Sequence, residues 1–183
     1  MTLFRVDLRL QPSPQGMPEL TNWPDATFTP DFAVAASGSA RFEFDGKVLG
    51  VAKDKNEPLL MPVEKLHGDA FNSWLPDYIA GFALNLAEAA AGIRQPSRSR
   101  SSAKFLDQPL ELRLSRVGDA EIKVTFRYQT GVVAEGVGPA VLILAEIGRA
   151  LQDFMVQLLS LNPRLAAYSE VVQLRKLIVQ ILS

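Results

Sequence analysis

His67 is the only histidine of the chain and the first side chain to weigh for acid–base catalysis, because imidazole titrates near neutral pH. Asp69 follows closely, and a Ser-His-Asp triad needs such a carboxylate. The serine of many such triads stands on a sharp glycine-rich turn between a strand and a helix. Ser37 and Ser39 flank Gly38 inside the alternating pattern of a strand, so they do not offer that turn. The sequence favours a structural role for His67.

Carboxylates near His67 could supply oxygen ligands to a metal ion; they are Asp54, Glu57, Glu64 and Asp69. Calcium and magnesium sites place such ligands at fixed positions of a loop. Residues 53–58 have the charge of a calcium loop but lack the glycine and the closing glutamate of an EF-hand. The chain has no cysteine, which excludes disulfides, thiol catalysis and cysteine-ligated metals. We therefore expect neither a metal nor another cofactor.

Gly131, Gly136 and Gly138 lie between a predicted strand and a predicted helix, where a phosphate-binding loop would stand. Pro139 and Ala140 follow in place of the lysine and the serine or threonine of a P-loop. Pro139 also removes a backbone amide that could bind an anion. The carboxylates give no pair for acid–base catalysis, since no feature of the sequence brings any two together. We expect a protein that is not an enzyme.

Residues 94–104 form a basic, serine-rich segment that contains Arg94, Arg98 and Arg100 and no acidic residue. Such a segment can contact phosphates, but the aromatic side chains that stack on single-stranded bases are missing from it. The formal net charge of the whole chain is −1, so no overall field steers nucleic acid towards it. Two interpretations remain, a solvated loop or part of a surface for a protein partner. The sequence argues against nucleic acid as a partner.

A proline-rich segment, residues 12–30, follows the first predicted strand and contains Trp23 and Asp25. Prolines at this density prevent a regular helix or ladder and stiffen the chain. Long connections of this kind are often functional. A stiff segment with a tryptophan loses little entropy on binding and offers a hot-spot side chain. We predict that Trp23 and Asp25 form a partner surface together with the arginines of residues 94–104.

Alternating apolar and polar residues predict strands that bury one face. Between two such runs, Asp45-Gly46 predicts a two-residue type I′ turn, because both residues tolerate positive φ. The predicted strands cover residues 3–10, 32–44, 47–52, 109–115 and 121–129.

Apolar residues at three- and four-residue spacing predict helices over residues 74–91, 139–161 and 163–182. Pro76 and Asp77 suit the first turn of the first helix, and Asn162-Pro163 suits the start of the last one. This order of elements is typical of an α+β fold. We expect one domain over residues 1–183, with an antiparallel sheet of about five strands covered by one central helix and a C-terminal pair of apolar helices.

The helix predicted over residues 139–161 is too apolar to stand uncovered in water. Its main apolar face is formed by Leu144, Ile147, Leu151, Phe154 and Leu158. The sheet of the same chain can cover this face, or a second copy can, which would make these residues a homodimer interface. The pattern is compatible with cover by the chain's own sheet and with cover by a second copy.

The composition is that of a folded globular protein, with 48% hydrophobic and 21% charged residues. No apolar stretch approaches the roughly 18 residues that a membrane span requires. The N-terminal residues lack the basic and then apolar layout of a signal peptide. We expect a cytoplasmic protein without a membrane span.

These features favour a non-enzymatic protein-binding module. Small α+β proteins without a catalytic constellation often act by occlusion, as immunity-type inhibitors of bacterial toxins do. One alternative is a homo-oligomeric structural or scaffold protein. Another is a small-ligand-binding protein with a pocket between sheet and helices, for which the lining candidates are Trp74, Tyr78, Phe82, Phe126 and Tyr128.

Overall fold

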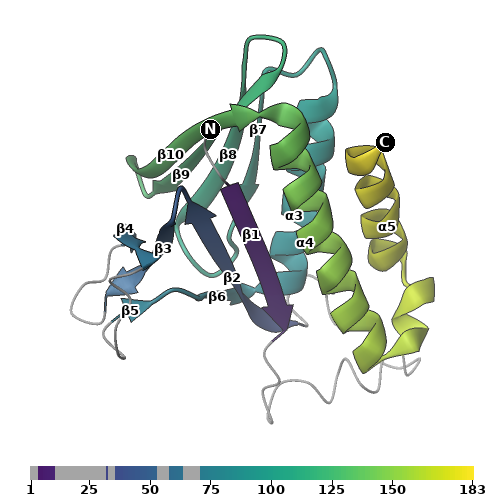
Figure 1. Ribbon diagram of the computed structural model, residues 1–183. Helices are drawn as coiled ribbons and strands as arrows, with labels where there is room; N and C mark the ends of the chain where they lie inside the picture. The colour runs from purple at the N-terminus through teal and green to yellow at the C-terminus, as the bar shows by residue number, and fades with distance from the viewer. Residues whose placement is uncertain (1–3, 11–31, 33–35, 53–57, 64–70) are drawn as a thin grey trace.

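The computed structural model describes residues 4–10, 32, 36–52, 58–63 and 71–183. Antiparallel strands form two sheets, and the long helices gather on one side of them (Figure 1). The α+β class is therefore confirmed. The strands divide between two sheets where the sequence predicted one, because alternation along a strand does not show which strand pairs with it.

The first sheet has six strands in the order β1-β2-β3-β4, with β5 added to β3 and β6 added to β2. Asp45 and Gly46 join β2 to β3 with φ values of 46° and 74°, so the predicted type I′ turn is confirmed. The strands are β1 (Phe4–Leu10), β2 (Ser37–Phe44), β3 (Lys47–Ala52), β4 (Pro58–Pro62), β5 (Phe71–Asn72) and β6 (Leu75–Tyr78).

The second sheet has four strands in the order β10-β9-β8-β7. Its central strands were predicted and its two outer strands were not. One of these, β7, lies in the basic segment that the sequence interpreted as a loop. Only Ala103 of β7 is fully buried, so the alternation of apolar and polar residues along this strand is too weak to predict the strand from the sequence. The strands are β7 (Arg100–Lys104), β8 (Leu110–Val117), β9 (Glu121–Tyr128) and β10 (Gly131–Pro139).

Three long helices and one short 3₁₀ helix complete the described elements: α3 (Ile79–Arg94), α4 (Ala140–Leu161), η3 (Pro163–Ala167) and α5 (Ser169–Leu182). The helix predicted over residues 139–161 is confirmed. The predicted start of the first helix is wrong, because Pro76 and Asp77 belong to β6, which pairs with β2. The predicted last helix is broken at Tyr168, whose extended backbone separates η3 from α5.

Phe42 of β2 stands at the centre of the core, with no exposed surface. Its ring centroid lies 4.4 Å from that of Phe126 in β9 and 6.0 Å from that of Phe82 in α3, both with edge contacts. The ring of Phe105, between β7 and β8, lies 6.1 Å away. Edge-to-face contacts of this kind add to the free energy of burial. One side chain thus joins both sheets to the central helix.

Polar side chains of α4 cover the free edge of β1, an end strand that pairs only with β2. Gln157 accepts a hydrogen bond from the Leu10 amide at 3.0 Å and donates one to the Leu8 carbonyl at 2.9 Å. Glu146 accepts one from the Val6 amide at 3.1 Å. An open sheet edge is a template for aggregation, and covering it with a helix is one protection that proteins use.

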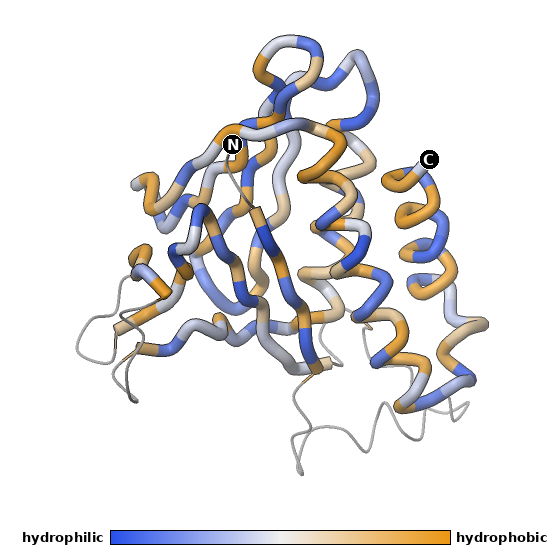
Figure 2. The backbone as a smooth tube through the Cα atoms, in the orientation of Figure 1, coloured by the Kyte–Doolittle hydropathy of each residue, from blue (hydrophilic) through white to orange (hydrophobic). Residues whose placement is uncertain are grey.

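Arg149 extends this contact between α4 and β1. It donates a hydrogen bond to the Val6 carbonyl at 2.7 Å, and its guanidinium also reaches Asp7 at 3.0 Å and Glu146 at 2.7 Å. Hydrogen bonding to Glu146, followed by that to Asp7, raises the pKa of Arg149 above its ordinary value. The helix and the strand are therefore joined by charged as well as neutral hydrogen bonds. Figure 2 shows hydrophobic positions recurring between these polar ones along both elements.

We expect Gln157→Ala to lower the free energy of unfolding by about 1–3 kcal/mol, because it leaves a part-buried amide and carbonyl of β1 without their partners. Chemical denaturation measures the loss, and hydrogen exchange should show faster exchange of the Leu10 amide. The matched control is Gln152→Ala on the exposed side of the same helix, which should change stability by at most about 0.5 kcal/mol. Equal losses in the two variants would contradict the edge contact.

Candidate partner-binding surfaces

Two of the predicted partner-binding residues, Trp23 and Asp25, lie outside the described residues. The same holds for His67 and for the carboxylates considered with it as metal ligands, namely Asp54, Glu57, Glu64 and Asp69. Within the described ranges, no group of three or more histidine, aspartate or glutamate side chains could hold a metal ion.

The predicted arginines Arg94 and Arg98 lie at the end of α3. Arg94 donates a hydrogen bond to the carbonyl of Ile181 at 2.9 Å, at the C-terminal end of α5. Arg116 of β8 donates to the carbonyls of Ile93 and Arg94 at 2.7 and 2.9 Å, and through Nε to that of Arg98 at 3.3 Å. Cations are stabilising at helix C-termini, where carbonyls lack helical partners. Arg94 therefore has a structural contact as well as an exposed surface.

The five residues predicted as a homodimer interface lie in the core of the single chain. Leu144 is 6% exposed, and the other four have no exposed surface. The strands and the helices α3 and α5 cover this face of α4, so in this conformation it has no room for a second copy. The pattern identified a face that must be covered, but it could not show that the chain covers that face itself.

The solvent side of the second sheet carries a concentration of basic side chains, which we call the basic face. Directly paired residues of neighbouring strands point to the same side of a sheet, so the register defines this face. Its basic members are Arg100, Lys104, Arg113, Lys123 and Arg127; its acidic members are Glu111, Glu121 and Glu135. Five cations against three carboxylates leave a formal charge of +2 on a chain whose total is −1.

Two of the three carboxylates of the basic face are already paired. Glu111 lies 2.9 Å from Arg113, and Glu135 lies 2.7 Å from Lys123. Among the described residues, Arg100, Lys104 and Arg127 have no carboxylate partner. Arg127 donates a hydrogen bond to the Thr130 carbonyl at 2.9 Å, while its buried Nε has no partner among the described residues. The face therefore offers cationic groups to an external acidic group.

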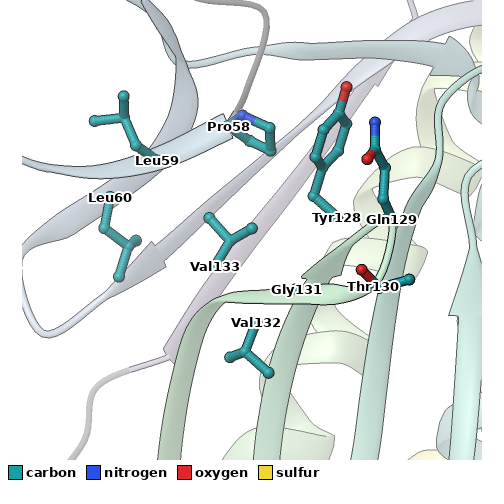
Figure 3. Close-up of a pocket in the computed structure, with 9 residues that line it drawn as sticks. All are labelled: Pro58, Leu59, Leu60, Tyr128, Gln129, Thr130, Gly131, Val132 and Val133. Atoms are coloured by element: carbon teal, nitrogen blue, oxygen red, sulfur yellow. The ribbon is translucent and has the colours of Figure 1, made fainter.

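A hollow of about 430 Å³ lies beside the basic face, between β4 and the turn that joins β9 to β10 (Figure 3). Pro58, Leu59 and Leu60 line one side of it, and residues 128–133 line the other. Val132 belongs to the hollow and is also paired with Arg127, so the hollow adjoins the basic face. One wall of the hollow is apolar, and the opposite wall carries amide and hydroxyl side chains. The hollow therefore suits a partner side chain that has both apolar and polar parts.

The pocket predicted between sheet and helices is filled where the core forms. Phe82 and Phe126, two of the side chains predicted to line it, have no exposed surface and contact Phe42. Trp74 lies elsewhere, with the guanidinium carbon of Arg9 at 4.0 Å from its ring centroid, in a cation–π contact. Tyr128 lines the hollow beside β4 instead. The five aromatic residues do not meet in one pocket.

A second surface feature is a groove on the outer side of the α4–α5 pair, which we call the hairpin groove. It has a volume of about 510 Å³. Met155, Val156 and Leu159 line it from α4, and Ile178 and Val179 line it from α5. Asp153 and Arg175 stand on its opposite sides, one on each helix.

Asp77 is the buried carboxylate with a shifted pKa, and such shifts are common at functional sites. Burial raises the pKa of Asp77 above its ordinary value, against the lowering effect of its backbone hydrogen bonds. Its oxygens accept hydrogen bonds from the amides of Leu106 at 3.0 Å and Asp107 at 2.8 Å. The carboxylate thus fixes the connection between β7 and β8 on β6, which is a structural role.

The pKa of Asp77 is raised in the folded state. The contribution of Asp77 to the free energy of unfolding is therefore complete below the ordinary aspartate pKa of about 3.9, and it is lost as pH rises through the pKa of the folded state. We expect Asp77→Asn to keep the hydrogen bonds that Oδ1 accepts and to remove this loss. The difference in unfolding free energy between variant and wild type should therefore grow in favour of the variant as pH rises above about 4. Urea denaturation across that range measures it, and a constant difference would contradict the assignment.

No protein-family model matches this sequence, no curated protein is significantly similar to it, and no solved structure is significantly similar to its fold. None of the helices in the described part of the chain is long and apolar enough to cross a lipid bilayer.

The sequence predicted Arg100 as a partner-binding residue and included Lys104 in the same basic segment, but it did not predict the other members of the basic face. Arg113, Lys123 and Arg127 are the polar positions of two strands that were predicted correctly. Their alternation could have placed them on the solvent side, but the pairing that gathers them with β7 does not follow from the pattern of any one strand.

Proposed function

We propose that this chain is a non-enzymatic protein-binding module whose basic face binds an acidic surface of another protein. The observation that carries the proposal is the group of three cations without carboxylate partners among the described residues, Arg100, Lys104 and Arg127, on a four-stranded sheet. A sheet holds side chains at fixed spacing, so little ordering is lost on binding.

The hollow between β4 and the β9–β10 turn supports this proposal. Interfaces combine a buried anchor with surrounding polar contacts. The hollow offers room for one anchoring side chain, and Val132, which is 57% exposed, lies between it and the basic face. An acidic partner with an apolar or amide anchor would therefore contact both features at once.

A protein fits the basic face better than nucleic acid does. Glu111 and Glu135 lie among the cations, where they would repel a phosphate backbone. The positions that form the face include no aromatic side chain for base stacking. The mixed charge matches a folded protein surface, where steering by complementary charges increases the association rate.

The finer form of the proposal is an immunity-type inhibitor that covers the active site of a bacterial toxin in the cytoplasm. Inhibition by occlusion needs a preorganised surface and no catalytic group. The absence of cysteine fits that compartment.

Affinity capture from the native lysate tests the proposal with the wild-type chain and Arg100→Glu/Lys104→Glu, which reverses two exposed cations of β7. We expect the wild type to retain one protein in stoichiometric amount. The reversal should weaken binding of the purified partner by about tenfold or more, and raised salt should weaken the wild-type complex. The matched control is Arg164→Glu/Lys176→Glu, two exposed cations of η3 and α5.

Two results would contradict the proposal. One is a partner that binds the β7 reversal and the control equally well. The other is capture that nuclease treatment abolishes, which would assign the basic face to nucleic acid.

A further inference from the structure

The backbone of β10 points alternately towards β9 and away from it, and one hydrogen bond shows which residues point which way. The amide of Ala140, just after the strand, donates to the Ala120 carbonyl at 2.8 Å and continues the register of β10 with β9. Residues that bond to a neighbouring antiparallel strand alternate with residues whose backbone groups face away from it. Gly138, two residues before Ala140, therefore faces β9, whereas the backbone groups of Glu135 and Val137 face outward.

The outer edge of β10 offers hydrogen-bonding groups at alternate positions. Glu135 and Val137 each present an amide and a carbonyl, and Pro139 presents a carbonyl alone. The place of Pro139 agrees with this assignment, because proline within a sheet lies where its nitrogen faces away from the ladder. Among the described residues, these outward groups have no backbone partner. Their spacing matches an extended segment, whose own amides and carbonyls alternate with the same period.

The outer edge of β4, the end strand nearest to β10, is closed to such a segment. The Val63 amide donates to the Gly46 carbonyl at 2.9 Å and continues the register of β4 with β3. By the same alternation, Pro58 and Pro62 face outward, where neither has an amide to donate. Prolines at these positions are a known protection of an edge strand.

Helices protect the other two end strands of five or more residues. The side chain of Gln157 in α4 bonds to the free edge of β1. Helix α3 packs along β7, and its Asn85 donates a hydrogen bond to the Lys104 carbonyl at 3.0 Å. The helix therefore lies in the way of a strand added there. In the part of the chain that the structure describes, β10 is the long end strand that is neither covered by a helix nor closed by outward prolines.

The regular part of the β10 edge ends at a bulge beside the hollow. The register with β9 shifts between Val132 and Ala134, which makes Val133 the extra residue. Val133 lines the hollow together with Leu60 of β4, and β4 contacts β10 (Figure 3). A segment paired with the regular part of β10 would therefore continue past the bulge into the hollow, whose volume of about 430 Å³ has room for one of its side chains.

We infer that an extended segment of the acidic protein partner adds to β10 as a further strand of the second sheet and places one side chain in the hollow. This inference rests on the proposed function and names the part of the partner that binds. Alternate side chains of the added strand point to the same side as Val132, Glu135 and Val137, which belong to the solvent side of the sheet. The added strand thus extends the basic face directly.

Charge favours an acidic segment over a second copy of the chain. Arg127 is paired with Val132 and has no carboxylate partner among the described residues. An acidic side chain beside Val132 can therefore reach this guanidinium across a short side chain. Two copies joined at β10 would instead place two basic faces side by side, and like charges set against each other weaken association.

Val137→Pro is the direct test, because it removes an outward amide that bonds to nothing within the described chain. An edge strand tolerates proline at such a position. We expect unchanged circular dichroism and an unchanged urea midpoint, with binding of the purified partner weakened by about tenfold or more. The matched control Val137→Thr keeps the amide and the β-branched shape and should bind as the wild type does.

Hydrogen exchange of the wild-type chain needs no variant. In the free chain, the amides of Glu135 and Val137 should exchange faster than the amide of Gly138, which already bonds to β9. The partner should slow exchange at Glu135 and Val137 by about tenfold or more if it adds a strand there. Unchanged exchange at both amides in the complex would overturn the inference.

Two probes separate this inference from the proposed function. The first is the protein that the wild type retains from its lysate, and the second is a library of random peptides about ten residues long. Equal binding of the retained protein by Val137→Pro and Val137→Thr would overturn the added strand, while the proposed function would stand if reversal of Arg100 and Lys104 still weakened binding. A wild-type dimer that Val137→Pro dissociates would assign the edge to a second copy and overturn the inference too.

A wild type that retains no protein would contradict the proposed function, and the peptides would then decide alone. Acidic peptides that bind the wild type and Val137→Thr but not Val137→Pro would support the added strand. Retention of no peptide, or only of peptides without acidic residues, would overturn it.

Discussion

The hydrogen bonds between α4 and the free edge of β1 are the constraint on which the rest of the structure depends. Gln157, Glu146 and Arg149 satisfy amides and carbonyls of β1 that would otherwise be open. This contact closes one end of the first sheet and fixes the rotation of α4 about its axis. The apolar side of the helix is then directed into the core, against the strands, α3 and α5.

The fixed rotation of α4 also determines which residues reach the surface. With its polar edge on β1 and its main apolar face in the core, Asp153 and Val156 must point outward. Helix α5 packs beside it and leaves the hairpin groove open. The second sheet is held on the other side of the core through Phe42 and Phe126, so its basic face also points to solvent. The basic face and the hairpin groove thus lie on different layers.

The strongly periodic elements could be predicted from the sequence, and the elements defined by pairing could not. Helix α4 and the Asp45-Gly46 turn follow from local pattern and turn chemistry. The pattern predicted the start of a helix where β6 lies, because Pro76 and Asp77 suit a first turn when β2 is not considered. Leu151 and Phe154 were correctly predicted to need covering, but the pattern cannot distinguish cover by the same chain from cover by a second copy. The basic face was only partly predicted, because its members come from separate strands that pairing brings together.

A basic face that is held open to solvent for an acidic protein partner is the central claim. Native mass spectrometry of the wild-type chain, isolated from its own cells with its bound partner, tests this claim directly. The account predicts a stoichiometric complex with another protein, which dissociates as salt is raised. The chain without a bound protein, or a complex that raised salt does not weaken, would contradict the claim.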